Sequence, residues 1–92
     1  MTYTALQTAR FGRQYKKLHD NVAVDVDGAV KVIAANPELG ERKKGDLAEL
    51  RVYKFHSQNQ LYLLGYTVDN QVRLVYLEAI GSHENLYRDL KR

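Results

Sequence analysis

Apolar and aromatic residues dominate the stretch from Leu47 to Ile80, where polar residues gather in two short breaks. The segments Leu61–Val68 and Val72–Leu77 are rich in β-branched and aromatic residues, and the polar pair Asp69-Asn70 between them favours a turn. We therefore predict a β-hairpin here. A third strand, over Leu47–Phe55, is expected to precede the hairpin, so that the stretch forms three consecutive antiparallel strands.

The N-terminal part of the chain shows helical spacing. Thr2–Gln7 can form a short first strand, and Thr8 is placed to cap a helix that runs to about His19, with apolar residues at i, i+4 and i+7 on one face. A second amphipathic helix is expected between Asp20 and Asn36-Pro37, because proline forces the residue before it out of the α region. The two helices are expected to form an antiparallel hairpin on one face of the sheet.

Gly81-Ser82-His83 follows the last expected strand without a linker. Ser82 is a suitable N-cap, and the acidic and basic residues after it match the dipole of a short C-terminal helix. We therefore predict one α+β domain over residues 1–92, in the order β-α-α-β-β-β-α. Its sheet is expected to be antiparallel, with the helical hairpin packed on it.

Composition narrows the class of protein. A chain of 92 residues can build one modest core. It has no cysteine, which excludes disulfides and thiolate metal ligands and fits a reducing cytoplasm. We see neither a leader sequence nor a span of membrane length, so we expect a soluble cytoplasmic protein. The net charge of +3 is compatible with a polyanionic partner, although many small domains without one are as basic.

Register reasoning brings two of the three histidines together. Turns centred near Gln58 and between Asp69 and Asn70 would pair Lys54 with the neighbourhood of Tyr62, His56 with that of Gln60, and Tyr62 with that of Leu77. His56 and His83 would then share one rim of the sheet, and Lys54 would point to the same face as His56. His83 and Tyr87 would share a face of the last helix.

These residue types suit RNA cleavage without a metal or other cofactor. Imidazole and phenol groups can act as base and acid, cations can neutralise the phosphate, and tyrosine can stack on a base. The alternatives stay open at this point: such histidines are more often surface or capping residues, the tyrosines can be core aromatics, and no third metal ligand is evident. The candidate catalytic residues are His83, His56, Tyr87 and Lys54, and the candidate RNA-binding residues are Arg51, Arg73 and Tyr62.

Several segments, taken in order, resemble the RelE/ParE superfamily of bacterial toxins, and most closely its RelE and YafQ branch of messenger RNA interferases. The resemblance covers nearly the whole chain. The segments that carry it are Thr8-Ala9-Arg10-Phe11, Tyr15-Lys16-Lys17-Leu18, Asn36-Pro37 to Gly40, Leu61-Tyr62-Leu63-Leu64-Gly65-Tyr66 and Gly81-Ser82-His83-Glu84-Asn85-Leu86-Tyr87.

The resemblance implies a toxin that cleaves messenger RNA on the ribosome and is held inactive by a cognate antitoxin in a toxin–antitoxin hetero-oligomer. His83 matches the catalytic histidine of YafQ, and Tyr87 matches the catalytic tyrosine of RelE. Lys54 and His56 fall where RelE has catalytic lysines. One departure is Leu63, because RelE has an arginine after the tyrosine of this strand. A gyrase inhibitor of the ParE type and an inactive antitoxin-binding relative are the alternatives.

Overall fold

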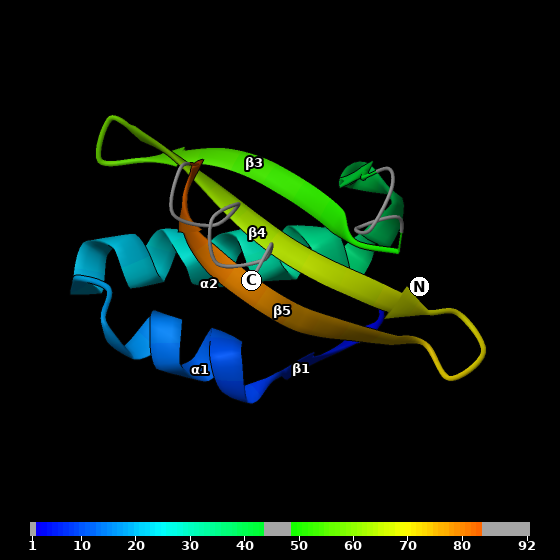
Figure 1. Cartoon of the computed structure of the whole chain (residues 1–92). Coiled ribbons are helices and arrows are strands. Elements are labelled where there is room, and N and C mark those ends of the chain that lie inside the picture. The colour runs from blue at the N-terminus through cyan, green and yellow to red at the C-terminus, as the bar shows by residue number, and fades with distance from the viewer. Residues whose placement is uncertain (1, 44–48, 84–92) are drawn as a thin grey trace.

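The computed structural model describes residues 2–43 and 49–83 (Figure 1). Five strands form one sheet in the order β1-β5-β4-β3-β2, and two α-helices and a short 3₁₀ helix connect β1 to β2. The prediction of a C-terminal helix concerns residues outside the described part. The elements are β1 (Thr4–Gln7), α1 (Ala9–Lys16), α2 (Asp20–Ala35), η1 (Pro37–Leu39), β2 (Glu41–Arg42), β3 (Arg51–Ser57), β4 (Gln60–Asp69) and β5 (Leu74–Ser82).

The sheet is mixed, which corrects the expectation of a purely antiparallel sheet. β1 lies parallel to β5, whereas the pairs β2–β3, β3–β4 and β4–β5 are antiparallel. Parallel neighbours need a long crossover, and here the helices and three strands supply it. The first and last strands of the described chain therefore lie side by side, and the remaining prediction of an α+β fold is confirmed.

The predicted cap of the first helix is confirmed. The Thr8 hydroxyl accepts a hydrogen bond from the Phe11 amide at 3.3 Å and donates one to the Leu77 carbonyl at 2.9 Å, so the same side chain starts α1 and fixes it to β5. α1 ends at Lys16, earlier than expected, because His19 adopts extended backbone as the N-cap of α2. None of the helices in the described part is long and apolar enough to cross a membrane.

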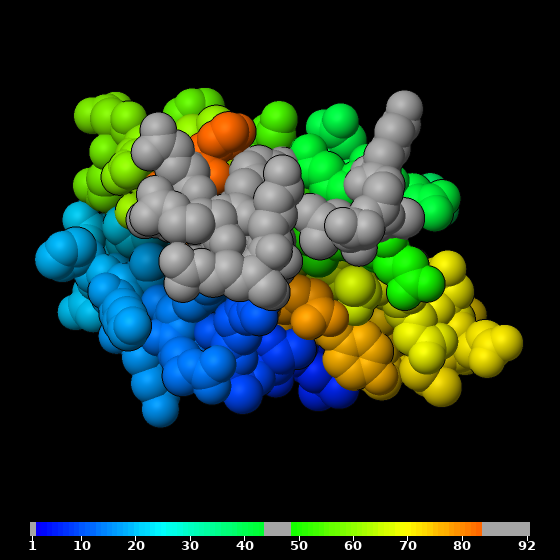
Figure 2. Space-filling view, viewed as in Figure 1, coloured from blue at the N-terminus to red at the C-terminus, as the bar shows by residue number. Residues whose placement is uncertain are grey.

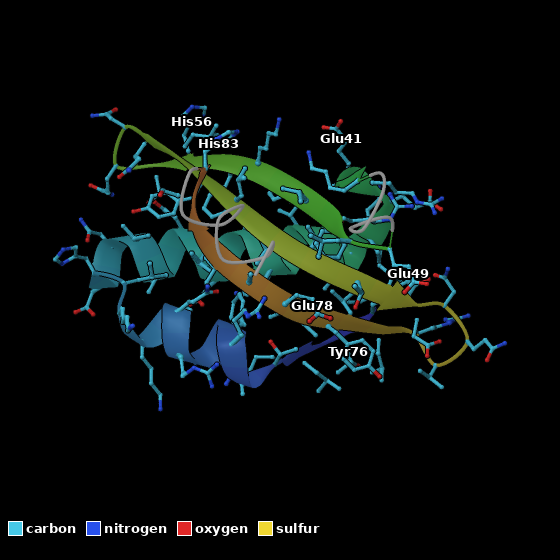
Figure 3. The ribbon with its side chains drawn as sticks, in the orientation of Figure 1. Glu41, Glu49, His56, Tyr76, Glu78 and His83 are labelled. Atoms are coloured by element: carbon cyan, nitrogen blue, oxygen red, sulfur yellow. The ribbon has the colours of Figure 1, made fainter. Side chains whose placement is uncertain are left out.

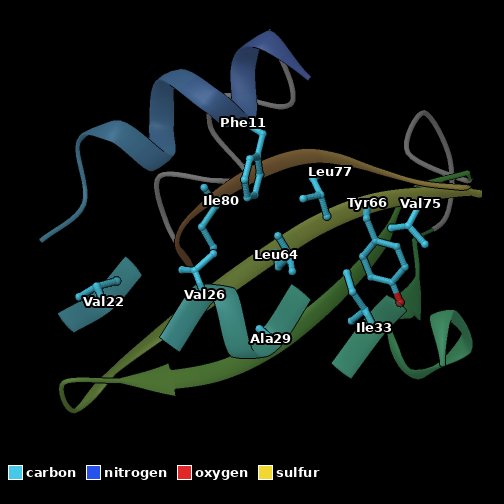
Figure 4. Close-up of a cluster of buried hydrophobic side chains, with 10 residues drawn as sticks. All are labelled: Phe11, Val22, Val26, Ala29, Ile33, Leu64, Tyr66, Val75, Leu77 and Ile80. Carbon is cyan, nitrogen blue, oxygen red and sulfur yellow. The ribbon is translucent and has the colours of Figure 1, made fainter. Parts of the chain in front are cut away.

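The main core lies between the helices and one face of the sheet (Figure 4). Phe11 of α1 and the inward side of α2 meet alternate residues of β4 and β5 there. A second, smaller cluster occupies the opposite face of the sheet, where Val52 and Leu63 are buried. The main cluster contains Phe11, Val22, Val26, Ala29, Ile33, Leu64, Tyr66, Val75, Leu77 and Ile80.

A buried tyrosine attaches the 3₁₀ helix to the sheet. The Tyr66 hydroxyl donates a hydrogen bond to the Pro37 carbonyl at 2.6 Å and accepts one from the Gly40 amide at 2.8 Å. Burial raises the pKa of this phenol above its ordinary value of 10.0. A Cβ atom at Gly40 would lie 2.7 Å from Tyr66 Cε1, so the close approach of the ring requires glycine. Arg51 strengthens this corner by donating to the Gly40 carbonyl at 2.9 Å.

The turns set a register different from the predicted one. Gln58 and Asn59 both have positive φ, 53° and 63°, which is the conformation of a two-residue type I′ hairpin, and Lys54 consequently pairs with Leu63 instead of Tyr62. Tyr62 pairs with Ser82, five positions beyond the expected Leu77. Most of that difference arises because the β4–β5 turn occupies residues 70–73, whereas the prediction centred it between Asp69 and Asn70. A bulge next to Gly65 shifts the pairing by one more residue.

The two hairpins lie at opposite ends of the molecule. The β3–β4 hairpin, in light green, and the β4–β5 hairpin, in yellow, project at the two ends of the face seen in Figure 2. The strands between them are long, so a residue near one hairpin is far from a residue near the other. This separation decides which of the predicted site residues can act together.

Candidate functional site

Lys54 and His56 lie on the face of the sheet opposite the one that packs against α1 and α2. Tyr53 and Phe55 alternate with them along β3 and pack against the core on the helical side, so the pleat directs the intervening side chains the other way. Val52, on the same side as Lys54, belongs to the smaller cluster of that opposite face. We call this side of the sheet the outer face. Both Lys54 and His56 are exposed on it.

His83 lies at the same rim as His56. In the sheet Phe55 pairs with Tyr62, and Tyr62 pairs with Ser82, so the next row runs from His56 through Leu61 to position 83. Two interstrand spacings separate the Cα atoms of the two histidines, which is roughly 10 Å. His83 follows β5 directly, is exposed, and lies close to His56 in Figure 3. The rim formed by Lys54, His56 and His83 is called the histidine rim below.

Tyr62 is not part of the histidine rim, contrary to the sequence prediction. The ring of Tyr62 stacks on that of Phe55, with centroids 6.1 Å apart, and packs against the main core on the helical face. The error follows from the hairpin: a shift of one residue in register moves a side chain to the other face of the sheet. Tyr62 therefore contributes to the core beneath the rim.

Arg51 also lies elsewhere. Its guanidinium donates to the carbonyl oxygens of Gly40 and Glu38, at 2.9 and 3.4 Å, on the edge of the sheet that η1 adjoins. Five residues of extended strand separate it from His56, which is roughly 17 Å. The structure therefore places Arg51 away from the rim, where its side chain binds residues 38 and 40, and a role of Arg51 in RNA binding stays a prediction.

Arg73 occupies the β4–β5 turn, where its φ of 56° helps to close the hairpin. The length of β5, roughly 26 Å, separates this turn from the histidine rim. Arg73 therefore does not reach the same phosphate as His83. Tyr87, the remaining predicted catalytic residue, lies outside the described residues.

A cavity that the sequence did not reveal lies at the end of the sheet far from the rim. It has a volume of about 400 Å³ and borders the short strand β2. The cavity could be predicted only if the pairing of Arg42 with Arg51 were known. A strand of two residues, such as β2, is too short to show the alternating pattern from which a strand is predicted. Its lining residues are Arg42, Glu49, Arg51, Thr67, Val68 and Asn70.

The histidine rim offers acid–base chemistry and a cation. The two imidazoles can serve as base and acid, and the Lys54 ammonium can stabilise an anion between them. Within residues 2–43 and 49–83, no three His, Cys, Asp or Glu side chains gather in a way that could hold a metal ion. Glu78, on the same face of β5, accepts a hydrogen bond from Thr67 at 2.9 Å and lies well away from the rim.

Solved structures with this fold come from bacteria and an archaeon. The toxin–antitoxin complex RelBE2 of Mycobacterium tuberculosis contains a chain with a TM-score of 0.78 and 21% identity, covering 90% of this chain and 100% of that chain. A variant of the E. coli toxin RelE in the free state gives a TM-score of 0.76 at 20% identity, covering 100% and 98%. The RelE–RelB complex of Pyrococcus horikoshii contains a chain with a TM-score of 0.61 and 15% identity, and the match covers 89% of this chain and 96% of that chain. At these identities the likeness establishes the fold.

Sequence comparison establishes the family. No curated protein matches the chain significantly. However, the sequence model of the family described as "ParE-like toxin of type II bacterial toxin-antitoxin system" matches residues 5–91, which is nearly the whole chain. The resemblance to the RelE/ParE superfamily is thereby confirmed. The chain belongs to the ParE-like toxins of type II bacterial toxin–antitoxin systems.

Proposed function

We propose that this toxin cleaves messenger RNA on the ribosome and thereby inhibits translation. The observation that carries the proposal is the histidine rim, where His56 and His83 flank the outer end of the sheet with Lys54 beside them. The three side chains are exposed, so an RNA strand can approach them from solvent. The active protein is expected in the cytoplasm, where ribosomes and transcripts are found.

The proposed reaction is an internal transfer at one phosphodiester. One imidazole takes the proton of the 2′-hydroxyl, and the 2′-oxygen attacks phosphorus. The bond from phosphorus to the 5′-oxygen breaks, and a second group protonates that leaving oxygen. The products are a 2′,3′-cyclic phosphate and a 5′-hydroxyl. His56 and His83 supply the base and the acid, with Tyr87 as the alternative acid, and Lys54 stabilises the extra phosphate charge.

The spacing of the two histidines suits this division of roles. Each imidazole must come within about 2.6–3.2 Å of its oxygen, and the attacking and leaving oxygens lie on opposite sides of phosphorus. Side chains that start from Cα atoms roughly 10 Å apart can lean toward a phosphate placed between them, with one imidazole at each oxygen. Leu61, which lies between His56 and His83 in the row, would form the floor below that phosphate.

An antitoxin is the partner that membership of this family implies. Similar chains from M. tuberculosis and E. coli were solved in toxin–antitoxin complexes. We propose that this toxin likewise forms a hetero-oligomer with a cognate antitoxin and that the ribosome and messenger RNA are its targets in the free state.

A second candidate function is non-enzymatic inhibition of DNA gyrase. The observation in its favour is that Arg51 and Arg73 lie far from the histidine rim, which leaves Lys54 as the cation that the described residues place there. A nuclease that stabilises the negative charge of the reacting phosphate would gain from a second cation. An inactive relative that only binds its antitoxin would be compatible with the same observation.

The test is to add the toxin to ribosomes that are translating a defined transcript. Mapping the 5′ ends of the transcript fragments then shows whether the toxin cleaves it. We expect His56→Gln and His83→Gln to lower the cleavage rate by about 10²- to 10⁴-fold, because each removes a positioned acid or base. His19→Gln is the matched control, since His19 is an exposed N-cap whose side chain makes no capping hydrogen bond. Intact transcripts together with blocked gyrase supercoiling would replace the nuclease proposal by the second candidate.

A further inference from the structure

The end of the sheet opposite the histidine rim holds two adjoining cavities. The larger one, of about 400 Å³, contains Arg42 and Arg51, and we call it the arginine cavity. The smaller one, of about 220 Å³, shares Arg51, Val68 and Asn70 with it and is called the side pocket. The other residues that line the side pocket are Tyr3, Ala35, Asn36, Pro37 and Glu38.

Two arginines lie side by side in the arginine cavity. Arg42 of β2 pairs directly with Arg51 of β3, and directly opposite residues of an antiparallel pair carry their side chains on the same face. The Arg51 guanidinium donates to the Glu38 and Gly40 carbonyls through Nη1 alone, so Nε and Nη2 remain for another acceptor. Like charges directly opposite one another destabilise a strand pair, and an anion bound between them would reverse that effect. The cavity therefore suits an anionic ligand.

The main chain of β4 adds a donor to this cavity. β3 pairs with β4 only as far as the row of Arg51 and Tyr66, and β4 continues for three residues beyond that row. The Leu50 carbonyl accepts a hydrogen bond from the Lys43 amide and so points toward β2. Because main-chain direction alternates along a strand, Arg51 points toward Tyr66, and Val68 points to the same side as Tyr66. The Val68 amide is thus directed past the end of β3, where Val68 lines the arginine cavity, and can donate to an anion there.

The side pocket has the features of a site for a nucleobase. Pro37 and Val68 provide apolar walls, against which a flat ring can pack. Asn36 is exposed at the junction of α2 and η1, and its side chain makes no capping hydrogen bond. Asn70 accepts a hydrogen bond from the Tyr3 hydroxyl through Oδ1 at 2.7 Å, which leaves its amide hydrogens for a ligand. Side-chain amides of this kind pair with N6 and N7 of adenine.

Two carboxylates distinguish a nucleotide from a simple anion as the ligand. Glu49 lines the arginine cavity and lies beside the end of β4 in Figure 3, and Glu38 lines the side pocket. Both would repel a bare phosphate ion. A nucleotide also carries hydrogen-bond donors, and a carboxylate accepts hydrogen bonds from ribose hydroxyls and from the amino group of a base. Two cations together with two carboxylates therefore fit a nucleoside phosphate better than inorganic phosphate.

We propose that the arginine cavity and the side pocket together bind one nucleoside phosphate. The phosphate lies between Arg42 and Arg51, and the base, preferably adenine, lies in the side pocket. The ligand is a free mononucleotide or one nucleotide of an RNA strand, since both present phosphate, ribose and base. This site is separate from the histidine rim, because Arg51 lies roughly 17 Å from His56 along β3. Binding there does not depend on the proposed cleavage reaction.

Titration of the free toxin with adenosine 5′-monophosphate, followed by calorimetry and by amide NMR spectra, tests the proposal. We expect a Kd below about 1 mM and shifts of the Val68 and Asn70 amide signals. Adenosine, which lacks the phosphate, and ribose 5-phosphate, which lacks the base, should each bind at least about tenfold more weakly. No binding of the mononucleotide at millimolar concentration overturns the proposal, and so does equally tight binding of ribose 5-phosphate.

Substitutions assign the binding to the named side chains. Arg42→Gln should weaken binding of the mononucleotide by about tenfold, because it removes a charged hydrogen-bond donor to the phosphate. Arg13→Gln is the matched control, since Arg13 is an exposed arginine on α1 and the net charge changes equally. Asn36→Ala should weaken the mononucleotide and leave ribose 5-phosphate unchanged. Arg42 and Asn36 are exposed, so both variants should fold, and equal effects of the two arginine substitutions would overturn the site.

Two further titrations locate the site and identify the source of the nucleotide. His83→Gln toxin should bind the mononucleotide as tightly as the wild type, and a clear loss would place the ligand at the histidine rim and overturn the proposal. A short oligoadenylate without a terminal phosphate is then compared with the mononucleotide on this variant. Shifts of Val68 and Asn70 at lower concentrations of the oligoadenylate would support an RNA strand as the source, and the reverse order would support a free nucleotide. Loss of binding in every arm would leave the cleavage assay as an independent test of the reaction.

Discussion

Removing the Tyr66 hydroxyl is expected to destabilise the whole domain. In Tyr66→Phe the Gly40 amide and the Pro37 carbonyl lose their partner, and both residues are buried. The ring itself keeps its place among the core residues, so the loss isolates the two hydrogen bonds. The connection between η1 and the sheet is the structural link that the substitution weakens.

The magnitude follows from the two groups left without partners. A buried backbone group that loses its hydrogen bond costs about 1–3 kcal/mol, and partial entry of water lowers the sum, so we expect about 2–4 kcal/mol. For a domain of this size each kcal/mol lowers Tm by about 4–8 °C, which gives a fall of roughly 10–25 °C. Such a loss is a large share of the stability of a typical small domain, about 5–15 kcal/mol.

Urea denaturation followed by circular dichroism, at pH 7 and across the alkaline range, measures the effect. Tyr15→Phe is the control, because its hydroxyl donates to Asp27 at 2.8 Å on the surface and its loss should cost under about 1 kcal/mol. The raised pKa of Tyr66 means that the unfolded chain ionises first. Its contribution to stability is therefore complete below pH 10.0, the ordinary value, and is lost as the pH rises through the folded-state pKa.

The reasoning fails if Tyr66→Phe and Tyr15→Phe unfold at the same urea concentration. It also fails if the alkaline loss of stability is as steep in Tyr66→Phe as in the wild type, because phenylalanine has no proton to lose. A change in the urea dependence itself, instead of the midpoint, would indicate an altered denatured state and would not count as support.

Two further substitutions probe local backbone and packing. Gly40→Ala should destabilise the domain by about 1–3 kcal/mol, because the new Cβ would lie 2.7–2.8 Å from ring carbons of Tyr66. Urea denaturation measures this change, and an unchanged stability would mean that the backbone at residue 40 moves away from the ring without cost. Gln58→Gly should stabilise by about 1 kcal/mol, because Gln58 has a φ of 53° that glycine adopts without strain; a lower Tm would contradict the type I′ turn.

The sequence predicted the elements well because local signals specify them. Thr8 caps α1 as expected, and the proline after Asn36 ends the second helix, which stops at Ala35. The parallel contact of β1 with β5 has no local signal, since it depends on where the chain returns after six intervening elements. The two residues of β2 are too few to show alternation.

The site could be predicted only in part, for a related reason. Lys54 and His56 share a face because they are two residues apart on one strand, and that relation does not depend on any turn. Tyr62 was assigned across a hairpin, where one residue of error reverses the face. Arg51 and Arg73 were grouped by charge, and charge gives no information on position along a strand.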